Sequence, residues 1–276
     1  MKIEELIYIK EESIVEKDRH CNIAHEHKGV ELIYTMHGMM NCQVGTEEFQ
    51  LKKGDLCFIN RKQLHNLSCI KGEACEHKVM IIDLPGLIQN QTIFEQYIQP
   101  LIEDQSFAHI RFEGNSSCAA IIGEDIIQIE KAMNEKKCGY GLEISSLVQH
   151  ILFQLYVAYC NRPKEKMFMH PHKLIFDQML EYISMQYGEE IGLNDIAEAG
   201  NVSRSQCIKI FKEYIQQSPI TYLNSYRLES SRNLLRATND AISSIALACG
   251  FREQSYFNKL FLREYGCTPN EYRRQK

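Results

Sequence analysis

Two segments near the C-terminus carry side chains that could read the edges of DNA bases. Each would present one polar and basic helix face, formed by Arg204, Ser205, Gln206, Lys209 and Lys212 in the first and by Gln254, Ser255, Asn258, Lys259 and Arg263 in the second. The DNA major groove admits one α-helix, whose first turns can place Lys or Arg against guanine and Gln or Asn against adenine. For either segment alone, a solvated helix face is the simpler interpretation.

An internal repeat relates the two segments. At an offset of 50 residues, Lys209-Ile210-Phe211 matches Lys259-Leu260-Phe261 and Ser218-Pro219 matches Thr268-Pro269, while Ile196-Ala197 matches Ile245-Ala246 at an offset of 49. A short helix, a tight turn and a longer helix that occur twice predict two helix-turn-helix modules. Because both polar faces fall at the same register of the repeat, DNA binding is favoured over two unrelated solvated faces.

The turns and helix starts that this repeat requires carry suitable residues. Gly200-Asn201 and Gly250 tolerate the left-handed conformation of a sharp turn between helices. Capping boxes are expected from Ser203 to Gln206 and from Thr268 to Glu271, and Ser218-Pro219 should open a long helix that ends near Ala237. The inward faces of the two longer helices should be Cys207, Ile210, Phe211 and Tyr214 in the first, and Tyr256, Phe257, Leu260 and Phe261 in the second.

The N-terminal half consists of short β-branched and aromatic runs that are cut by turns. We expect strands at Val30 to His37, Met39 to Val44, Phe49 to Leu51, Asp55 to Ile59 and Cys75 to Leu84, which together predict a sandwich or barrel. Residues 1–18 precede the first expected strand and are a candidate lid.

Two amphipathic helices are expected after residue 115, over Ser117 to Lys136 and Leu142 to Cys160. Their apolar residues recur at three- and four-residue spacing. In the second helix, Leu147, Ile151, Leu155 and Ala158 form one stripe that must be buried. The stripe could pack as core or serve as an oligomer interface, and we predict dimerisation through this helical hairpin.

Composition limits the function classes. With 276 residues, 44% of them hydrophobic and 24% charged, the chain fits a globular protein of two domains. It shows neither a signal peptide nor a membrane span, so a cytoplasmic location is expected. Its 11 cysteines are scattered without a CxxC pair, which is typical of reduced packing thiols. The net charge of −5 is uneven, because residues 171–276 carry 13 basic and 12 acidic side chains.

The C-terminal pattern resembles the paired helix-turn-helix domain of the AraC family of bacterial transcription regulators. The resemblance covers residues 193–274 and includes Ile196-Ala197, Phe211-Lys212, Ser218-Pro219, Arg227-Leu228, Gly250-Phe251, Ser255-Tyr256-Phe257 and Thr268-Pro269. It implies recognition helices at about 203–216 and 254–265 in successive major grooves, with Ser205, Lys209, Ser255 and Lys259 at base-reading positions. The chain departs from the family at Asn201 and Gln217, where glycines are usual.

The N-terminal half resembles the cupin-type sensor barrel of many members of that family. His25-Glu26-His27, Glu31, Gly38, Gly54-Asp55 and His65 carry the resemblance. Strand alternation would place His25, His27, Glu31, Ile33 and Thr35 on one side, where they could meet His65. Three imidazoles and one carboxylate suit Zn, Fe, Mn or Ni. The resemblance leaves three possibilities open: an organic effector pocket formed by these six residues, a metal held by His25, His27, Glu31 and His65, and an enzymatic centre.

These observations predict a two-domain α+β transcription regulator that is not an enzyme. A cupin-like effector and dimerisation domain should span residues 1–160, a linker 161–171, and an AraC-type DNA-binding domain of seven helices 172–276. The expected partners are double-stranded promoter DNA, a small-molecule effector, RNA polymerase and a second copy of the chain, with no membrane and no cofactor. The alternatives are a metal sensor or metal-dependent cupin enzyme fused to a DNA-binding domain, and an architectural DNA-binding protein without an effector.

Overall fold

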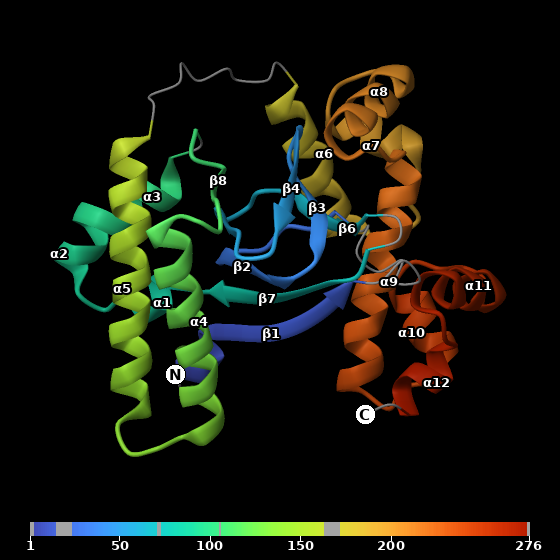
Figure 1. The fold of residues 1–276 in the computed structure, drawn as a ribbon. Helices are drawn as coiled ribbons and strands as arrows, with labels where there is room; N and C mark the ends of the chain where they lie inside the picture. The colour runs from blue at the N-terminus through green and yellow to red at the C-terminus, as the bar shows by residue number, and fades with distance from the viewer. Residues whose placement is uncertain (1–2, 15–23, 71–72, 105, 163–171, 275–276) are drawn as a thin grey trace. The chain divides into compact units, whose positions relative to one another are not determined.

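The chain forms two compact units in a computed structural model that describes residues 3–14, 24–70, 73–104, 106–162 and 172–274 (Figure 1). We call the described residues up to 162 the sheet domain and residues 172–274 the helical domain. Most of the predicted linker, from residue 163 onward, lies outside the described residues, so the predicted domain boundaries stay predictions.

The sheet domain contains two antiparallel sheets. The larger sheet has the strand order β1 (Ile7–Ile14), β7 (Cys75–Ile82), β2 (Val30–His37), β5 (Leu56–Ile59) and β8 (His109–Phe112). The smaller sheet has the order β4 (Glu47–Lys52), β3 (Met39–Val44) and β6 (His65–Cys69). The predicted combination of a sheet-rich N-terminal domain and a helical C-terminal domain is thereby confirmed.

The larger sheet has two different buried faces. Leu32 lies opposite Phe58 on β5 and Met80 on β7, and all three are fully buried in one core with the helices. Side chains alternate along a strand, so Glu31, Ile33 and Thr35 occupy the other face of β2. We call this second face the inner face, because a hydrogen bond from His65 on β6 to Glu31 joins it to the smaller sheet.

Helices cover the outer face of the larger sheet. Three short helices and a π-helical turn, α1 (Leu84–Leu87), α2 (Gln91–Ile93), η3 (Phe94–Ile98) and α3 (Gln99–Glu103), precede the long antiparallel pair α4 (Ser117–Glu135) and α5 (Tyr140–Asn161) (Figure 1). Ser116 caps α4 by accepting a hydrogen bond from the Ala119 amide. Residues from both long helices share a core with the sheet, including Ile122, Ile126, Ile129, Ile144, Val148 and Ile151.

The prediction that the apolar stripe of the second helix forms an oligomer interface is wrong. Ile151 and Leu155 are fully buried in the core of the sheet domain, and Leu147 packs against it. The outer face of the larger sheet is apolar and has to be covered, and this stripe covers it. The two possibilities that the sequence left open are thus decided in favour of core.

The described part of the predicted lid, residues 3–14, belongs to the sheet domain instead, and the rest of residues 1–18 lies outside the described residues. Residues Ile7–Ile14 form β1, which pairs with β7 along all eight residues. Lys78 on β7 fixes this strand to the helices, because its buried ammonium group donates hydrogen bonds of 2.7 Å to Glu11 on β1 and to Glu130 on α4. The sequence also failed to predict β6 and β8, whereas β2, β3, β5 and β7 lie close to their predicted bounds.

The helical domain confirms the internal repeat. Its described helices are α6 (Lys173–Gln186), α7 (Leu193–Ala199), α8 (Arg204–Ile215), α9 (Pro219–Ala237), α10 (Ile242–Ala248), α11 (Gln254–Tyr265) and α12 (Pro269–Arg274). Both ends of α8 and α11 differ by the offset found in the sequence, and so do the starts of α9 and α12. Two helix-turn-helix modules, α7 with α8 and α10 with α11, are joined by α9.

The predicted turn and capping residues adopt the conformations that the two modules require. Asn201 has a φ of 50° and Gly250 a φ of 80°, so the asparagine takes the left-handed position in the first module. The Ser203 hydroxyl accepts a hydrogen bond from the Gln206 amide at 3.2 Å. Thr268 and Glu271 form the expected reciprocal box, in which the Thr268 amide donates to the Glu271 carboxylate at 2.7 Å. The predicted capping box is thus confirmed at Thr268, whereas at Ser203 the helix start is confirmed through the Ser203 hydroxyl and the Gln206 side chain lies against the His172 ring.

Gly123 allows α4 to pack closely against Tyr34 on β2. A Cβ atom at Gly123 would lie 2.6 Å from two ring carbons of Tyr34. Gly123→Ala should therefore lower the free energy of unfolding by about 1 to 3 kcal/mol, although alanine favours helices by about 1 kcal/mol. Urea unfolding of the full chain, followed by far-ultraviolet circular dichroism, measures the change.

Gly141→Ala is the matched control, because a Cβ at Gly141 in α5 would meet no atom within 4 Å. This variant should be neutral or more stable by up to about 1 kcal/mol. Equal stability of the two variants would contradict the close packing of α4 on β2.

Candidate functional site

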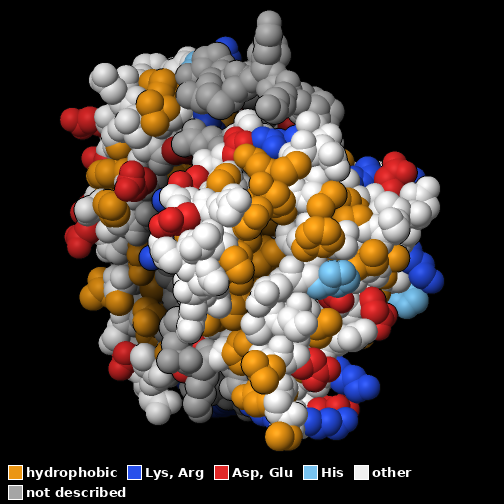
Figure 2. All heavy atoms as spheres, turned by 90° about the vertical axis from the view of Figure 1, so that its left-hand side faces the viewer, with side chains coloured by type: hydrophobic (Ala, Val, Ile, Leu, Met, Phe, Trp, Pro, Cys, Tyr) orange, Lys and Arg blue, Asp and Glu red, His pale blue; other side chains and the backbone are white. Residues whose placement is uncertain are grey.

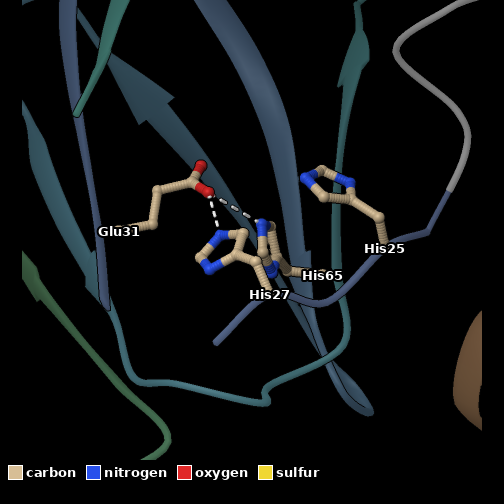
Figure 3. Close-up of side chains that lie close together, drawn as sticks. All are labelled: His25, His27, Glu31 and His65. Carbon is tan, nitrogen blue, oxygen red and sulfur yellow. Dashed lines mark hydrogen bonds and ion pairs between the residues drawn. The ribbon is translucent and has the colours of Figure 1, made fainter. Parts of the chain in front are cut away.

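Four side chains with metal-ligating atoms converge at one end of the inner face (Figure 3). His25 and His27 lie on the segment before β2, Glu31 is the second residue of β2, and His65 is the first residue of β6. One ligating atom from each lies within 4.8 Å of the others. We call these four residues the His/Glu cluster, which joins two sheets and a third chain segment.

The two inner histidines direct the same ring atom to the same carboxylate oxygen. His27 Nε2 lies 2.5 Å from Glu31 Oε2, and His65 Nε2 lies 3.2 Å from the same oxygen. Their Nδ1 atoms lie 2.9 Å from the Gly29 carbonyl and 2.8 Å from the Gln63 carbonyl. A carbonyl oxygen can only accept, so both Nδ1 atoms carry hydrogen and both Nε2 atoms face the carboxylate.

The charges in the cluster stabilise one another. Burial of Glu31 opposes its ionisation, but the charge of His65 and hydrogen bonds from His27 and His65 outweigh burial and hold the pKa of Glu31 well below its usual range. Burial likewise opposes protonation of His65, but the Glu31 carboxylate outweighs it and raises the pKa of His65. The cluster is therefore a buried carboxylate that two imidazole Nε2 atoms face, and this arrangement favours positive charge beside Glu31, carried either by protonated rings or by a bound cation.

The segment that carries His25 and His27 does not follow the expected strand alternation. Both residues precede β2, and the backbones of His25 and His65 instead exchange hydrogen bonds of 2.9 and 3.0 Å in an isolated bridge. Glu31 and His65 are buried, His27 is half-buried and His25 is exposed. The structure thus brings together the four predicted donors, but from three chain segments.

The rest of the inner face is tightly filled. Ile33 and Thr35, predicted as pocket residues, lie two and four residues beyond Glu31 on β2 and have no exposed surface. Cys42 and Cys57, on the two sheets, are also fully buried, and their mutual hydrogen bond followed by burial raises the pKa of Cys57. Both residues were missed as neighbours of the cluster, although strand alternation places Cys57 beside Ile33.

A second polar position on the inner face was also missed. His77 on β7 lies opposite Thr35, and both side chains are fully buried. Within the described residues, the Thr35 hydroxyl and both His77 ring nitrogens lack a hydrogen-bond partner, and the nearest carboxylate oxygen of Glu12 lies 3.8 Å from His77 Nε2. Alternation along β7 was the available signal, because Val79 and Ile81 share the face of His77.

The first recognition helix presents most of its predicted residues to solvent. Ser205, Lys209 and Lys212 are exposed on α8, and Arg204 is exposed while donating a hydrogen bond to Asn194 on α7. Gln206 is different, because it is half-buried and its amide lies 3.2 Å from the His172 ring. Four of the five residues predicted for the outward face of α8 are therefore exposed, and Gln206 is not.

The second recognition helix presents the corresponding face. Gln254, Ser255, Lys259 and Arg263 are exposed on α11, whereas Asn258 is half-buried with its carbonyl oxygen covered. The prediction that Tyr256 packs inward is wrong, since it is 47% exposed and its hydroxyl accepts a hydrogen bond from Asn224 on α9. Phe257, which was predicted to pack inward together with Tyr256, does fill the core.

Arg227 on α9 connects the two modules. Its guanidinium donates hydrogen bonds of 2.7 Å to the Tyr187 carbonyl and 2.8 Å to the Glu189 carbonyl, in the turn between α6 and α7. The same group lies 5.9 Å from the ring centre of Phe251, in the turn between α10 and α11. A Cβ at Gly250 would approach the Arg227 Nε to 2.8 Å, so glycine is needed there for this contact.

Comparison with known proteins decides the family. A model described as an AraC-like ligand binding domain matches residues 15–152, half of the chain, and a helix-turn-helix domain model matches residues 196–275. The chain belongs to the AraC family. As an AraC-family protein it is a DNA-binding transcription regulator with an N-terminal ligand-binding domain, which confirms the predicted function at that level.

Individual relatives agree with this assignment. The chain is 26% identical over 251 residues to the uncharacterized HTH-type transcriptional regulator YdeC of Bacillus subtilis, which covers 91% of this chain and 85% of YdeC. It is 22% identical over 257 residues to the HTH-type transcriptional activator RhaR of Yersinia pseudotuberculosis, covering 92% of this chain and 85% of RhaR. The fold is similar to that of ToxT from Vibrio cholerae, with a TM-score of 0.53, 13% identity and coverage of 98% of each chain.

Among the described residues, none of the helices combines the length and apolar character that are needed to cross a bilayer.

Replacement of Arg227 tests the connection between the two modules. Arg227→Ala leaves two carbonyl groups without their donors and should lower the free energy of unfolding by about 2 to 4 kcal/mol. Arg236→Ala, at the exposed end of α9, removes only a ring contact of 5.1 Å with Tyr272 and should cost at most about 1 kcal/mol. Urea unfolding of the full chain compares them, and equal losses would contradict the bridging role of Arg227.

Proposed function

We propose that this AraC-family regulator reads promoter DNA with α8 and α11 and senses its effector at the His/Glu cluster. The observation that supports DNA reading most strongly is the repeat of exposed Ser205 and Lys209 at Ser255 and Lys259. The observation that supports effector sensing is the convergence of four side chains from three chain segments, of which Glu31 and His65 are buried.

The DNA contacts divide into two kinds in this proposal. Ser205, Lys209, Ser255 and Lys259 lie in the first half of their helices and would reach base edges in two successive turns of the major groove. Lys212 and Arg263 lie later in the helices and would contact phosphates, which adds affinity without sequence preference. Arg204 and Gln254 flank the base-reading residues, whereas the half-buried Gln206 and Asn258 have fewer exposed atoms to offer.

Substitutions in both recognition helices test base reading. Lys209→Ala and Lys259→Ala should each weaken binding to the preferred site by about 1 to 3 kcal/mol and relax preference at positions about one helical turn apart. The preferred site is first selected from a random duplex pool with the wild-type chain, and each variant is then measured on it and on single-base substitutions.

Arg263→Ala is the contrasting variant. If Arg263 contacts phosphate, its loss should weaken binding to all DNA sequences alike. The slope of log affinity against log salt concentration should then become shallower by about one unit. Equal losses from both lysine substitutions on selected and unselected DNA would reject the base-reading assignment.

The effector region in this proposal is the inner face around the cluster, namely His25, His27, Glu31, Ile33, Thr35 and His65. We propose that it binds a ligand and does not catalyse a reaction. The neighbouring Cys57 supports this reading, because its hydrogen bond with Cys42 and its burial raise the pKa of its thiol and so disfavour a nucleophilic thiolate. RNA polymerase stays a predicted partner on the basis of the family alone.

We also propose that the chain dimerises, but through a different face of α5 from the one that the sequence predicted. Leu142, Phe153 and Val157 are 80%, 60% and 40% exposed, and all three belong to α5. Hydrophobic side chains are gathered on the side of the molecule that Figure 2 shows. Exposed apolar side chains of this size are typical of a surface that binds another protein, and a second copy is the simplest occupant.

Lysine substitutions at exposed and at buried positions of α5 distinguish an interface from the core. The variant Phe153→Lys with Val157→Lys should be a folded monomer in light scattering and circular dichroism, because it alters only exposed positions. Ile151→Lys places a charge in the fully buried core and should instead unfold the sheet domain. A dimer that persists in the double variant would reject this face as the interface.

A further inference from the structure

The arrangement of donors in the His/Glu cluster identifies the chemistry of its ligand. We infer that the cluster binds a divalent first-row transition metal ion, held by His25, His27, Glu31 and His65, and that this ion is the effector. The inference rests on the proposed function, in which this cluster is the effector site, and it narrows that proposal to one class of ligand.

The hydrogen bonds of the imidazoles prepare them as metal ligands. In metal sites a ligating histidine usually donates its other ring N–H to a carbonyl or carboxylate, which fixes the ring and its tautomer. His27 and His65 have this arrangement, because their Nδ1 groups donate to the Gly29 and Gln63 carbonyls. Both Nε2 atoms then point at Glu31 Oε2, the third donor atom.

The size of the cluster fits an ion better than an organic molecule. Donor atoms in a four-coordinate zinc site lie about 3.3 Å apart, given bonds of about 2.0 to 2.1 Å, and the four donors here lie within 4.8 Å of one another. Beyond them, Ile33, Thr35 and Cys57 are fully buried by protein. Contraction around a cation requires only small side-chain movements, and His25 is the exposed member of the four.

The donor set also selects the class of metal. Imidazole suits Zn, Fe, Co, Ni and Cu, whereas Mg and Ca prefer sites made only of oxygen ligands. Thiolates would favour Cu(I), but the four donors include no cysteine. A site of three imidazoles and one carboxylate therefore fits a divalent transition metal.

Metal binding at this position would connect three chain segments. Glu31 belongs to the larger sheet, His65 to the smaller sheet, and His25 and His27 to the segment before β2. His25 is joined to β6 by one pair of backbone hydrogen bonds. An ion bound by all four side chains would fix this segment to both sheets, so the metal-bound and metal-free forms would differ in a way that can affect DNA binding.

Cobalt(II) is a suitable probe, because its visible absorption reports coordination directly. The full chain, freed of metal with a chelator, should bind about one equivalent of Co²⁺, develop absorption bands and melt at a higher temperature. His25→Ala and Glu31→Gln should each weaken Co²⁺ binding by more than the roughly 10- to 100-fold loss caused by removing an outer-shell partner. His25→Ala changes an exposed residue, so it tests the site even if Glu31→Gln unfolds.

His37→Ala is the matched control, since His37 is an exposed histidine at the far end of β2. It should bind Co²⁺ like the wild type. Absence of Co²⁺ binding, or unchanged binding in both cluster variants, would overturn the inference.

The effector role needs a second readout. Saturating Co²⁺ should change the affinity of the wild-type chain for the selected DNA site by at least about 5-fold, and His25→Ala should abolish the change. Unchanged affinity in the presence of bound Co²⁺ would overturn the effector role. That outcome is distinct from failure of the proposed DNA-binding function, which would appear as loss of site-specific binding by the metal-free chain.

Discussion

A buried carboxylate that receives two imidazole nitrogens on one oxygen constrains the whole sheet domain. Glu31 is 2% exposed, and its charge would be costly to bury without His27 and His65. To satisfy it, the chain has to bring β2, β6 and the segment before β2 to one point. Strand pairing places Glu31 on the inner face of β2, and the apolar residues of β2 pack on the outer face. The inner end of β2 can therefore be reached by β6 and by the segment that carries His25 and His27.

A different constraint organises the helical domain. Each module has its own aromatic core, and α9 supplies residues to both, so the separation of α8 and α11 depends on one continuous helix. Arg227 strengthens this connection by bonding the turn after α6 while contacting the turn before α11. Two recognition helices at a fixed separation can read two successive major grooves, which one module alone cannot do.

The sequence predicted the helical domain closely, because repeats, capping residues and left-handed turn residues are local signals. Tyr256 was placed wrongly, since helical periodicity alone does not distinguish it from Phe257 at the core boundary. The sheet domain was predicted less well. β1 lacks clear alternation, so its strand character depends on pairing with β7, which is far along the chain. Similarly, the stripe with Ile151 and Leu155 could be assigned to core only once the apolar outer face of the sheet was known. The sequence predicted that the four residues of the cluster would lie together, but not that they would come from three segments.

The most direct test of the account is anomalous diffraction from crystals of the full chain soaked with Zn²⁺ or Co²⁺. The account predicts one strong peak at the end of the inner face, about 2.1 Å from the Nε2 atoms of His27 and His65 and in contact with Glu31 and His25. A map without a peak at this position, or with an organic molecule bound between these side chains, would contradict it.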